Sequence, residues 1–326
     1  MAKVKFGIQI SARYYDVKDW SELKATALYC EKLGYDSVWF GDHLTTGGSR
    51  LECWTVLSAL SLITSAVGLG TMVLCNNWRN PSLLAKMAAT LDVISDGRLE
   101  LGIGAGWNET EHETYGYPFP SPRARVERLK EGVEIIKKMW TEDRPSYKGK
   151  HYWIREAICD PKPVQKPYPP IMIGGGGEQL TLRVVASCAD RWNFGGDIEQ
   201  YKHKWEILEN YCKKVGRDPK EIEKTCFTSM DVQRDIEASL QVMRDVYNRD
   251  YDGRPVKQSA LFEEWFEKFK TRAVVGTPEE CLKRIRELTD AGITYFIFRS
   301  ARQTPNLKKM RESLQIFAED VKSQIN

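Results

Sequence analysis

The sequence lacks any long apolar run: no stretch approaches the roughly 18 consecutive apolar residues that a membrane-spanning helix needs. Its start, MAKVKFGIQIS, moves directly into a strand pattern, so we expect no secretory leader. Together these absences argue against a membrane partner and against a secreted protein. We therefore expect a soluble, cytoplasmic protein.

Closely spaced cysteines are missing as well. The eight cysteines are scattered along the chain, and no two lie closer than 14 positions. There is no C-x-x-C motif and no Cys/His ligand spacing, which argues against a disulfide framework and a zinc-type site. The sequence thus predicts reduced, buried thiols, in agreement with a reducing cytosol, and no catalytic metal.

Positive and negative charges are nearly balanced along the chain. Lys and Arg number 48 and Asp and Glu 45, for a net charge of +3. The densest basic segments, 202–204 and 213–214, lie in a helical pattern and are interpreted as a solvated helix face. This distribution excludes the basic surface that nucleic acids require. A small molecule is the expected partner.

The sequence is rich in short apolar runs that alternate with helix patterns. The eight predicted strands cover 5–11, 37–42, 68–74, 98–104, 171–173, 192–194, 224–230 and 294–298. None shows a polar face, which is typical of parallel strands buried under helices. Eight such units in 326 residues predict an α/β protein with a (β/α)8 TIM barrel as a single domain, 1–326. The charged segment 231–270 breaks this rhythm and is predicted to be a helical insertion between strands seven and eight.

The carboxyl ends of the strands form the active face of a barrel. The residues predicted there are Gln9, Ser11, Asp42, His43, Leu74 to Asn77, Gly104 to Asn108, Gly174 to Glu178, Asn193 to Gly196, Arg299 and Ser300. This set is rich in glycine and poor in charge, which suits a large, flat, anionic cofactor better than a metal ion. The alternative for the glycines is a tight turn between strand and helix.

Histidine is scarce, with four residues in the chain, and His43 stands beside Asp42 at a predicted strand end. Imidazole titrates near neutrality, so His43 can serve as a proton donor or acceptor. The alternative is a structural pair that bridges loops. His112, with Glu109 and Glu113 on the next helix, is interpreted as a member of simple surface pairs.

Four segments carry a resemblance to a known family. They are SVWFGDHL over 37–44, DVISDGRLELGIGAGWNETEHETYGYPFP over 92–120, PPIMIGGGGEQLTLRVVASCADRWN over 169–193, and VGTPEE over 275–280. The chain resembles the bacterial-luciferase-like flavin and deazaflavin oxidoreductases, which are (β/α)8 barrels. It looks most like the branch that uses 8-hydroxy-5-deazaflavin, coenzyme F420, while relatives that use FMN carry much of the same pattern.

The resemblance implies roles for individual residues. Asp42 would lie against the cofactor ring, with His43 as its catalytic neighbour. A non-prolyl cis peptide bond at Met72–Val73 would back the ring, with Cys75 just beyond it. The remaining implied cofactor contacts are Trp107 and Asn108 at the ring or ribityl chain, and Gly176, Gly177, Glu178 and Thr181 at the phosphate.

Trp107 marks a departure from one group of relatives. Deazaflavin sugar-phosphate dehydrogenases have an acid where this chain has Trp107. The replacement removes one of their catalytic groups and argues against a sugar-phosphate substrate. The predicted strand-end residues also contain no basic cluster for a second phosphate.

We expect an F420-dependent oxidoreductase that transfers a hydride between the deazaflavin and a small organic substrate. The alternatives are an FMN-dependent monooxygenase on the same barrel and, from another class, a non-catalytic flavin-binding barrel. The loop 45–54 and the insertion 231–270 are expected to shape the substrate pocket. The segment LFEEWFEKF, 261–269, is interpreted as a helix packed on its own barrel, the alternative being a homodimer interface.

Overall fold

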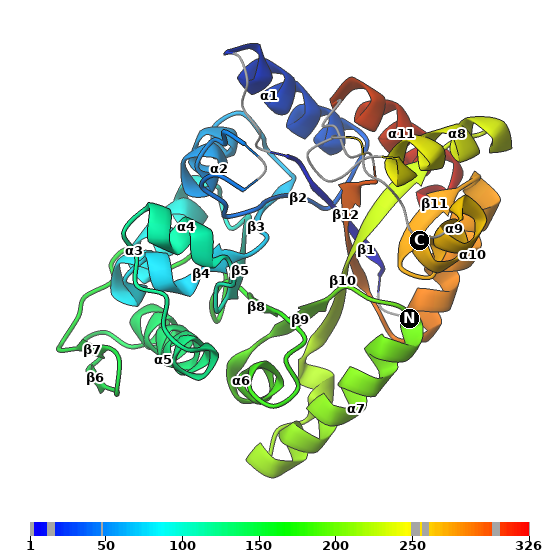
Figure 1. Cartoon of the computed structure of the whole chain (residues 1–326). Helices are drawn as coiled ribbons and strands as arrows, with labels where there is room; N and C mark the ends of the chain where they lie inside the picture. Colours follow the sequence, from blue (N-terminus) through cyan, green and yellow to red (C-terminus); the bar gives the residue numbers. More distant parts are fainter. Residues whose placement is uncertain are drawn as a thin grey trace.

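Parallel strands form a closed ring with helices outside it in the computed structural model (Figure 1). The structure describes residues 3–11, 17–46, 48–248, 255, 261–301 and 307–325. The ring consists of β1 (Lys5–Gln9), β2 (Ser37–Phe40), β3 (Gly68–Thr71), β5 (Leu99–Gly104), β8 (Ile171–Gly174), β9 (Arg191–Phe194), β10 (Glu223–Val232) and β12 (Tyr295–Ser300). Every neighbouring pair is parallel, and β12 pairs with β1 to close the ring. The predicted (β/α)8 barrel is confirmed.

Helices follow the strands and cover the outside of the ring (Figure 1). They are α1 (Val17–Lys32), α2 (Cys53–Ser61), α3 (Pro81–Ile94), α4 (Glu109–Thr114), α5 (Pro122–Thr141), α6 (Thr181–Cys188), α7 (Ile198–Val215), α8 (Ile236–Tyr247), α9 (Phe262–Lys270), α10 (Pro278–Asp290) and α11 (Leu307–Asp320), with short 3-10 turns η1 (Asn76–Trp78), η2 (Pro219–Glu221) and η3 (Lys322–Gln324). Local sequence sets several starts: Asn80 caps α3, and Thr277 and Glu280 form a capping box on α10. No described helix is both long and apolar enough to cross a membrane.

The interior of the ring is filled by side chains, as in a packed barrel. Trp39 is fully buried there, and its indole N–H donates to Ser37 Oγ at 2.6 Å. Gly7 and Gly70 make room for it, because a Cβ at either position would lie within 2.4 Å of the Trp39 side chain. The ring is therefore solid at its centre, and any large ligand must bind at an end.

The amino-terminal end of the ring is closed by ion pairs between the first residues of strands. Lys5 pairs with Glu223 at 2.9 Å, and Arg191 pairs with Glu223 at 2.6 Å and also with Glu100. Arg191 is buried, and its carboxylate neighbours raise its pKa above the usual range against the opposing effect of burial. This leaves the carboxyl-terminal end for a site.

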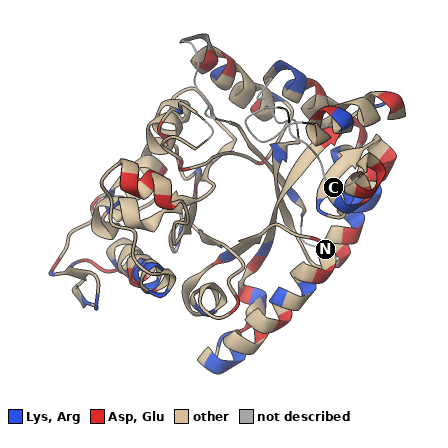
Figure 2. Cartoon of the chain, in the orientation of Figure 1, with Lys and Arg blue, Asp and Glu red and all other residues tan. Residues whose placement is uncertain are grey.

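Further elements lie outside the ring. The β11 strand (Ala273–Gly276) pairs with β10, and β4 (Leu74–Cys75) pairs with β5. The strands β6 (Tyr147–Lys148) and β7 (Trp153–Ile154) form a separate antiparallel hairpin. Charged residues of both signs cover outer helices such as α7, while the ring carries few (Figure 2).

The segment 231–270 holds α8 and α9 between β10 and β12, although β10 continues to Val232 and so takes its first two residues. Residues 249–254 and 256–260 of this segment lie outside the described residues. Within α9, Phe262 is buried and Trp265 is partly buried against Val242 and Met243 of α8. The aromatic face of α9 thus packs on its own chain.

Candidate functional site

A cavity of about 570 Å³ opens at the carboxyl-terminal end of the ring. Residues at or just after the ends of β1, β2, β3, β5, β8, β9 and β12 line it, together with Phe227 from the middle of β10. Seven predicted site residues are among them: Asp42, His43, Met72, Val73, Cys75, Trp107 and Asn108. These seven positions therefore meet in one space, whereas the four predicted phosphate residues, Gly176, Gly177, Glu178 and Thr181, are not among its lining residues.

The chain crosses the wall of the cavity after β3 in an unusual conformation. The Met72–Val73 peptide bond is cis, as the family resemblance implies. Val73 lies against the glycines of two other strands: a Cβ at Gly104 would lie 2.9 Å from Val73 Cγ2, and one at Gly174 would lie 3.1 Å from Val73 Cγ1. Glycine at these two positions admits the Val73 side chain, so that Val73 itself forms part of the cavity wall.

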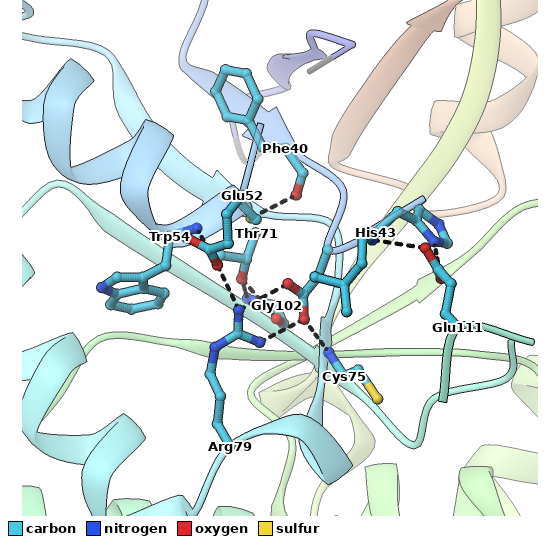
Figure 3. Close-up of polar contacts among 12 residues, drawn as sticks. Phe40, His43, Glu52, Trp54, Thr71, Cys75, Arg79, Gly102 and Glu111 are labelled. Atoms are coloured by element: carbon cyan, nitrogen blue, oxygen red, sulfur yellow. Dashed lines mark hydrogen bonds and ion pairs between the residues drawn. The ribbon is translucent and has the colours of Figure 1, made fainter. Parts of the chain in front are cut away.

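Asp42 is held in place from several sides. Its Oδ2 accepts from the Cys75 N–H at 2.8 Å and from Arg79 Nη1 at 2.7 Å, and its Oδ1 accepts from Arg79 Nη2 at 2.9 Å. Arg79 also donates to Glu52, the N-cap of α2, at 2.7 Å (Figure 3). Asp42 therefore ties the ends of β2 and β3 to the start of α2, and a two-point guanidinium pair fixes its geometry.

His43 is paired with a buried acid that the sequence analysis did not select. Glu111 Oε2 lies 2.9 Å from His43 Nδ1 (Figure 3), and Glu111 Oε1 accepts from the backbone N–H groups of Leu44, Thr45 and Thr46 at 2.7–3.0 Å. Burial opposes ionisation of Glu111, but these hydrogen bonds outweigh it and lower its pKa to about 2.

An ionised Glu111 accepts only, so His43 Nδ1 must carry the proton of this contact. The network thereby assigns the tautomer and leaves Nε2 as the nitrogen that can exchange a proton.

Trp107 and Asn108 occupy the other side of the His43 ring. Trp107 is 69 % exposed, and its ring meets that of His43 edge-on at 5.8 Å between centroids. Asn108 caps α4 by accepting from the Glu111 N–H at 3.3 Å, and its Nδ2 donates to Thr46 Oγ1. Trp107 is free to contact a ligand, whereas the Asn108 amide holds the loop in shape.

His112 corrects an expectation. The prediction of a surface pair is wrong, because His112 is fully buried. Its Nδ1 lies 2.8 Å from the Asn108 carbonyl, and its Nε2 lies 3.7 Å from Cys75 Sγ. Its ring packs against Trp78 of η1 at 5.3 Å. Burial raises the pKa of Cys75 to about 12, so the thiol next to His112 stays protonated at neutral pH.

The predicted phosphate residues gather in the loop between β8 and α6. The cavity lining reaches Gly174 and Gly175, directly before Gly176 and Gly177, while Thr181 is the first residue of α6. The residue before α6 provides no side-chain cap. A helix start without a cap leaves backbone N–H groups available to an anion.

Lys204 adds a cation to this loop that the sequence analysis interpreted as part of a solvated face. Its Nζ donates to the Gly176 carbonyl at 2.8 Å and to Glu178 Oε1 at 2.7 Å. Its side chain is only 18 % exposed, compared with 54 % for Lys202. The interpretation holds for Lys202 and is wrong for Lys204, because α7 turns this residue toward the β8 loop.

No group of three or more His, Cys, Asp or Glu residues in the described part of the chain could hold a metal ion. The arrangement instead combines one positioned imidazole, a flat backbone wall and a glycine loop. Together these can place a planar cofactor and move a proton at one ring nitrogen.

Comparison with known proteins shows the family to which this chain belongs. The profile of the luciferase-like monooxygenases matches residues 4–295. The chain belongs to this family. One luciferase-like relative is a protein of Microbacterium testaceum named F420-dependent glucose-6-phosphate dehydrogenase, 29 % identical over 312 residues, which cover 90 % of this chain and 91 % of the relative.

Solved structures of luciferase-like proteins share the fold. The monooxygenase RslO1 from Streptomyces bottropensis superposes with a TM-score of 0.81 at 21 % identity, covering 99 % of this chain and 100 % of RslO1. An F420-dependent secondary alcohol dehydrogenase in complex with an F420–acetone adduct gives 0.78 at 22 %, covering 98 % of each chain. At this identity the likeness concerns the fold alone.

Proposed function

We propose that this luciferase-like protein is a coenzyme F420-dependent oxidoreductase that transfers a hydride between the deazaflavin and a small organic substrate. The observation that carries the proposal is the His43–Glu111 pair, which faces the cavity beside Met72 and Val73. The named activity of the Microbacterium testaceum relative, which aligns with 90 % of this chain, supports the choice of F420.

The residues present fit such a cofactor. A planar ring suits the apolar part of the lining formed by Met72, Val73 and Leu74. The loop from Gly175 to Thr181 suits the phosphate, because it leads into an uncapped helix start, while Lys204 beside it is paired with Glu178. When bound, the deazaflavin supplies a ring carbon that accepts or releases a hydride.

The chain itself supplies proton handling and alignment. Glu111 fixes the His43 ring through Nδ1, so that Nε2 can take a proton from, or return one to, a substrate oxygen. Trp107 stands edge-on to His43 and provides an apolar wall that limits water around the imidazole. The imidazole is thus held ready before substrate arrives, which reduces the cost of orienting it.

The substrate differs from that of the sugar-phosphate dehydrogenases. Trp107 replaces their acid, and Glu111 cannot take its place, because its two oxygens already accept from His43 and from three backbone N–H groups. The proposed enzyme therefore relies on one proton-transfer group, His43.

Parallel titration of the purified protein with F420 and with FMN tests the proposal. Binding of F420 at micromolar concentration or tighter, with weak or no binding of FMN, is the expected result. A preference for FMN would overturn the proposal, and so would failure to bind either molecule.

An FMN-dependent monooxygenase is the second candidate. The observation that favours it is the shared fold with the FMN complex of the diketocamphane monooxygenase of Pseudomonas putida, at a TM-score of 0.78. Oxygen consumption in the presence of reduced FMN distinguishes this candidate from an F420 enzyme, because deazaflavin reacts poorly with oxygen.

We also propose that the protein works in a reducing compartment such as the cytoplasm. All eight cysteines are free and buried. Unpaired cysteines in this number are typical of proteins that fold where thiols stay reduced.

A further inference from the structure

Two arginines bring positive charge into the cavity. Arg50 belongs to the loop after β2, within the segment expected to shape the substrate pocket, and Arg299 is the penultimate residue of β12. The sequence analysis found no basic cluster at the strand ends. The structure brings these two side chains, 249 positions apart in the chain, to the lining of one space.

Each arginine is held by neutral partners. Arg50 Nε donates to the Thr46 carbonyl, while Arg299 Nε donates to Ser229 Oγ at 3.1 Å and its guanidinium lies 5.5 Å from the centre of the Phe227 ring. Among the residues that the structure describes, neither guanidinium forms an ion pair with a carboxylate. Both are therefore oriented without being neutralised by these neighbours.

The carboxylates of the cavity are already engaged elsewhere. Asp42 accepts from Arg79 through both oxygens and from the Cys75 N–H. Glu111 accepts from His43 and from the loop after β2. A guanidinium presents five N–H donors in a planar fork that matches the oxygens of a carboxylate or phosphate. The unmatched charge in the cavity is thus positive and suited to an oxyanion.

The two arginines lie across the barrel from the loop assigned to the cofactor phosphate. In the ring, β12 and β2 are the neighbours of β1, and Arg299 is the register partner of Gln9 on β1. The order β1–β2–β3–β5–β8 places β8 four positions from β1, which is the opposite side of an eight-stranded ring. A cofactor phosphate at Gly175–Thr181 therefore leaves the arginine side of the cavity to another ligand.

We propose that the substrate carries an oxyanion group, a carboxylate or a phosphate, which Arg50 and Arg299 bind at the side of the cavity opposite the cofactor phosphate. This inference rests on the proposed function, because it assumes that the cofactor phosphate binds beside β8. It restricts the substrates to be screened to organic acids and phosphate esters.

The test uses three probes of similar size: benzoate, its neutral analogue benzamide, and phenyl phosphate. Each is titrated by calorimetry into the wild-type protein loaded with its cofactor. We expect at least one anionic probe to bind about tenfold tighter than benzamide, as charge-assisted hydrogen bonds imply. Benzoate and phenyl phosphate then decide between the two kinds of oxyanion. Equal affinities, or no binding of either anion, would overturn the proposal.

Substitution of Arg50 and of Arg299 tests whether these side chains produce the preference for anionic probes. Arg50→Gln and Arg299→Gln should each weaken the anionic probe about tenfold and leave benzamide within twofold. Arg50→Lys and Arg299→Lys keep the charge and should retain part of the preference, which separates charge from folding. Arg123→Gln is the matched control, because Arg123 is an exposed residue of α5 with a surface pair to Glu127. Retention of the full preference in both glutamine variants would refute the assignment.

A second titration distinguishes binding of a substrate oxyanion by the two arginines from binding of the cofactor by them. If the arginines bind the substrate, Arg50→Gln and Arg299→Gln leave F420 affinity within twofold. A tenfold loss of F420 affinity, without a preference for anionic probes, would assign the arginines to the cofactor and overturn the proposal. Failure of the proposed function has a different signature, namely that the wild-type protein binds FMN instead of F420 or binds neither.

Discussion

The loops that follow β5 and β8 both contain glycine, yet they use it for different purposes. After β5, a Cβ at Gly106 would lie 2.5 Å from Cys75 Sγ, because protein side chains fill the surrounding space. After β8, Gly176 and Gly177 precede a helix that has no side-chain cap. The first loop orders protein groups around His43, whereas the second leaves backbone donors for a ligand. Gly176 also serves packing, because a Cβ there would lie 2.6 Å from the Phe194 ring, so the uncapped helix start is what distinguishes the β8 loop.

Substitution of His43, whose ring contacts Trp107 of the β5 loop, tests the role of that loop. It should have the largest effect on turnover. His43→Ala should lower turnover by about 10²- to 10⁴-fold, the range that a positioned acid–base group contributes. F420 affinity should stay within twofold, because the β8 loop is untouched. Steady-state kinetics and cofactor titration measure the two quantities. His151→Ala is the control, since His151 pairs with Glu127 outside the cavity, and unchanged turnover in His43→Ala would refute the assignment.

Arg79→Met tests the buried ion pair between Arg79 and Asp42, the residue before His43. The substitution leaves the buried Asp42 without its two guanidinium bonds, and loss of one partner of a buried pair costs about 3–5 kcal/mol. Urea unfolding should show this loss. The double variant Asp42→Asn with Arg79→Met should recover part of it, because no uncompensated charge remains. A loss below about 1 kcal/mol, as at surface pairs, would contradict the structural role.

Two glycine substitutions compare the loops directly. Gly106 has a φ of +77°, so Gly106→Ala should lower the free energy of unfolding by about 1–3 kcal/mol. Gly177→Ala should weaken F420 binding with little loss of stability, since its nearest neighbour is the Thr181 hydroxyl at 2.9 Å from the new Cβ. Thermal unfolding measures the stability of each variant, and cofactor titration measures its affinity for F420. The reverse pattern would show that the roles of the loops are exchanged.

The last prediction concerns the stability of the protein at acid pH. The pKa of Glu111 is about 2 in the folded protein, compared with 4.5 for an unperturbed glutamate side chain, so the unfolded chain binds more protons. Its contribution to stability is therefore complete above about pH 4.5 and is lost as the pH falls toward 2. Urea midpoints of the wild type and Glu111→Gln should approach each other as the pH falls from 5 toward 2. A constant difference over this range would contradict an ionised Glu111.

The strands were predictable because burial on both faces demands continuous apolar runs. The segments 37–42 and 98–104 correspond to β2 and β5, and the residues directly after β2, Asp42 and His43, reach the cavity as expected. Parallel strands bring their carboxyl ends to one side, so position along the chain determines which residues meet. This logic found His43, whereas the wall at Met72–Val73 was implied by the family resemblance.

Glu111 and His112 were not predictable from the same logic. Their local pattern, ETEHET, is typical of an exposed helical turn. Both are buried because α4 packs on distant segments, with Glu111 receiving the N–H groups of residues 44–46 and His112 meeting Cys75. Arg50 and Arg299 escaped detection as a pair for a similar reason, since only closure of the ring brings β12 near β2. Burial by a remote loop leaves no periodic trace in the sequence.

Closure of the ring by β1 and β12 has a consequence for synthesis on the ribosome. Lys5 is the register partner of Tyr295, so the first strand made must wait for nearly the whole chain before it gains its second neighbour. Until then β1 presents an open edge, which is a template for pairing with other chains. The long sequence separation also delays this contact relative to local ones. The edge of β1 is therefore where mispairing is expected for as long as β12 is absent.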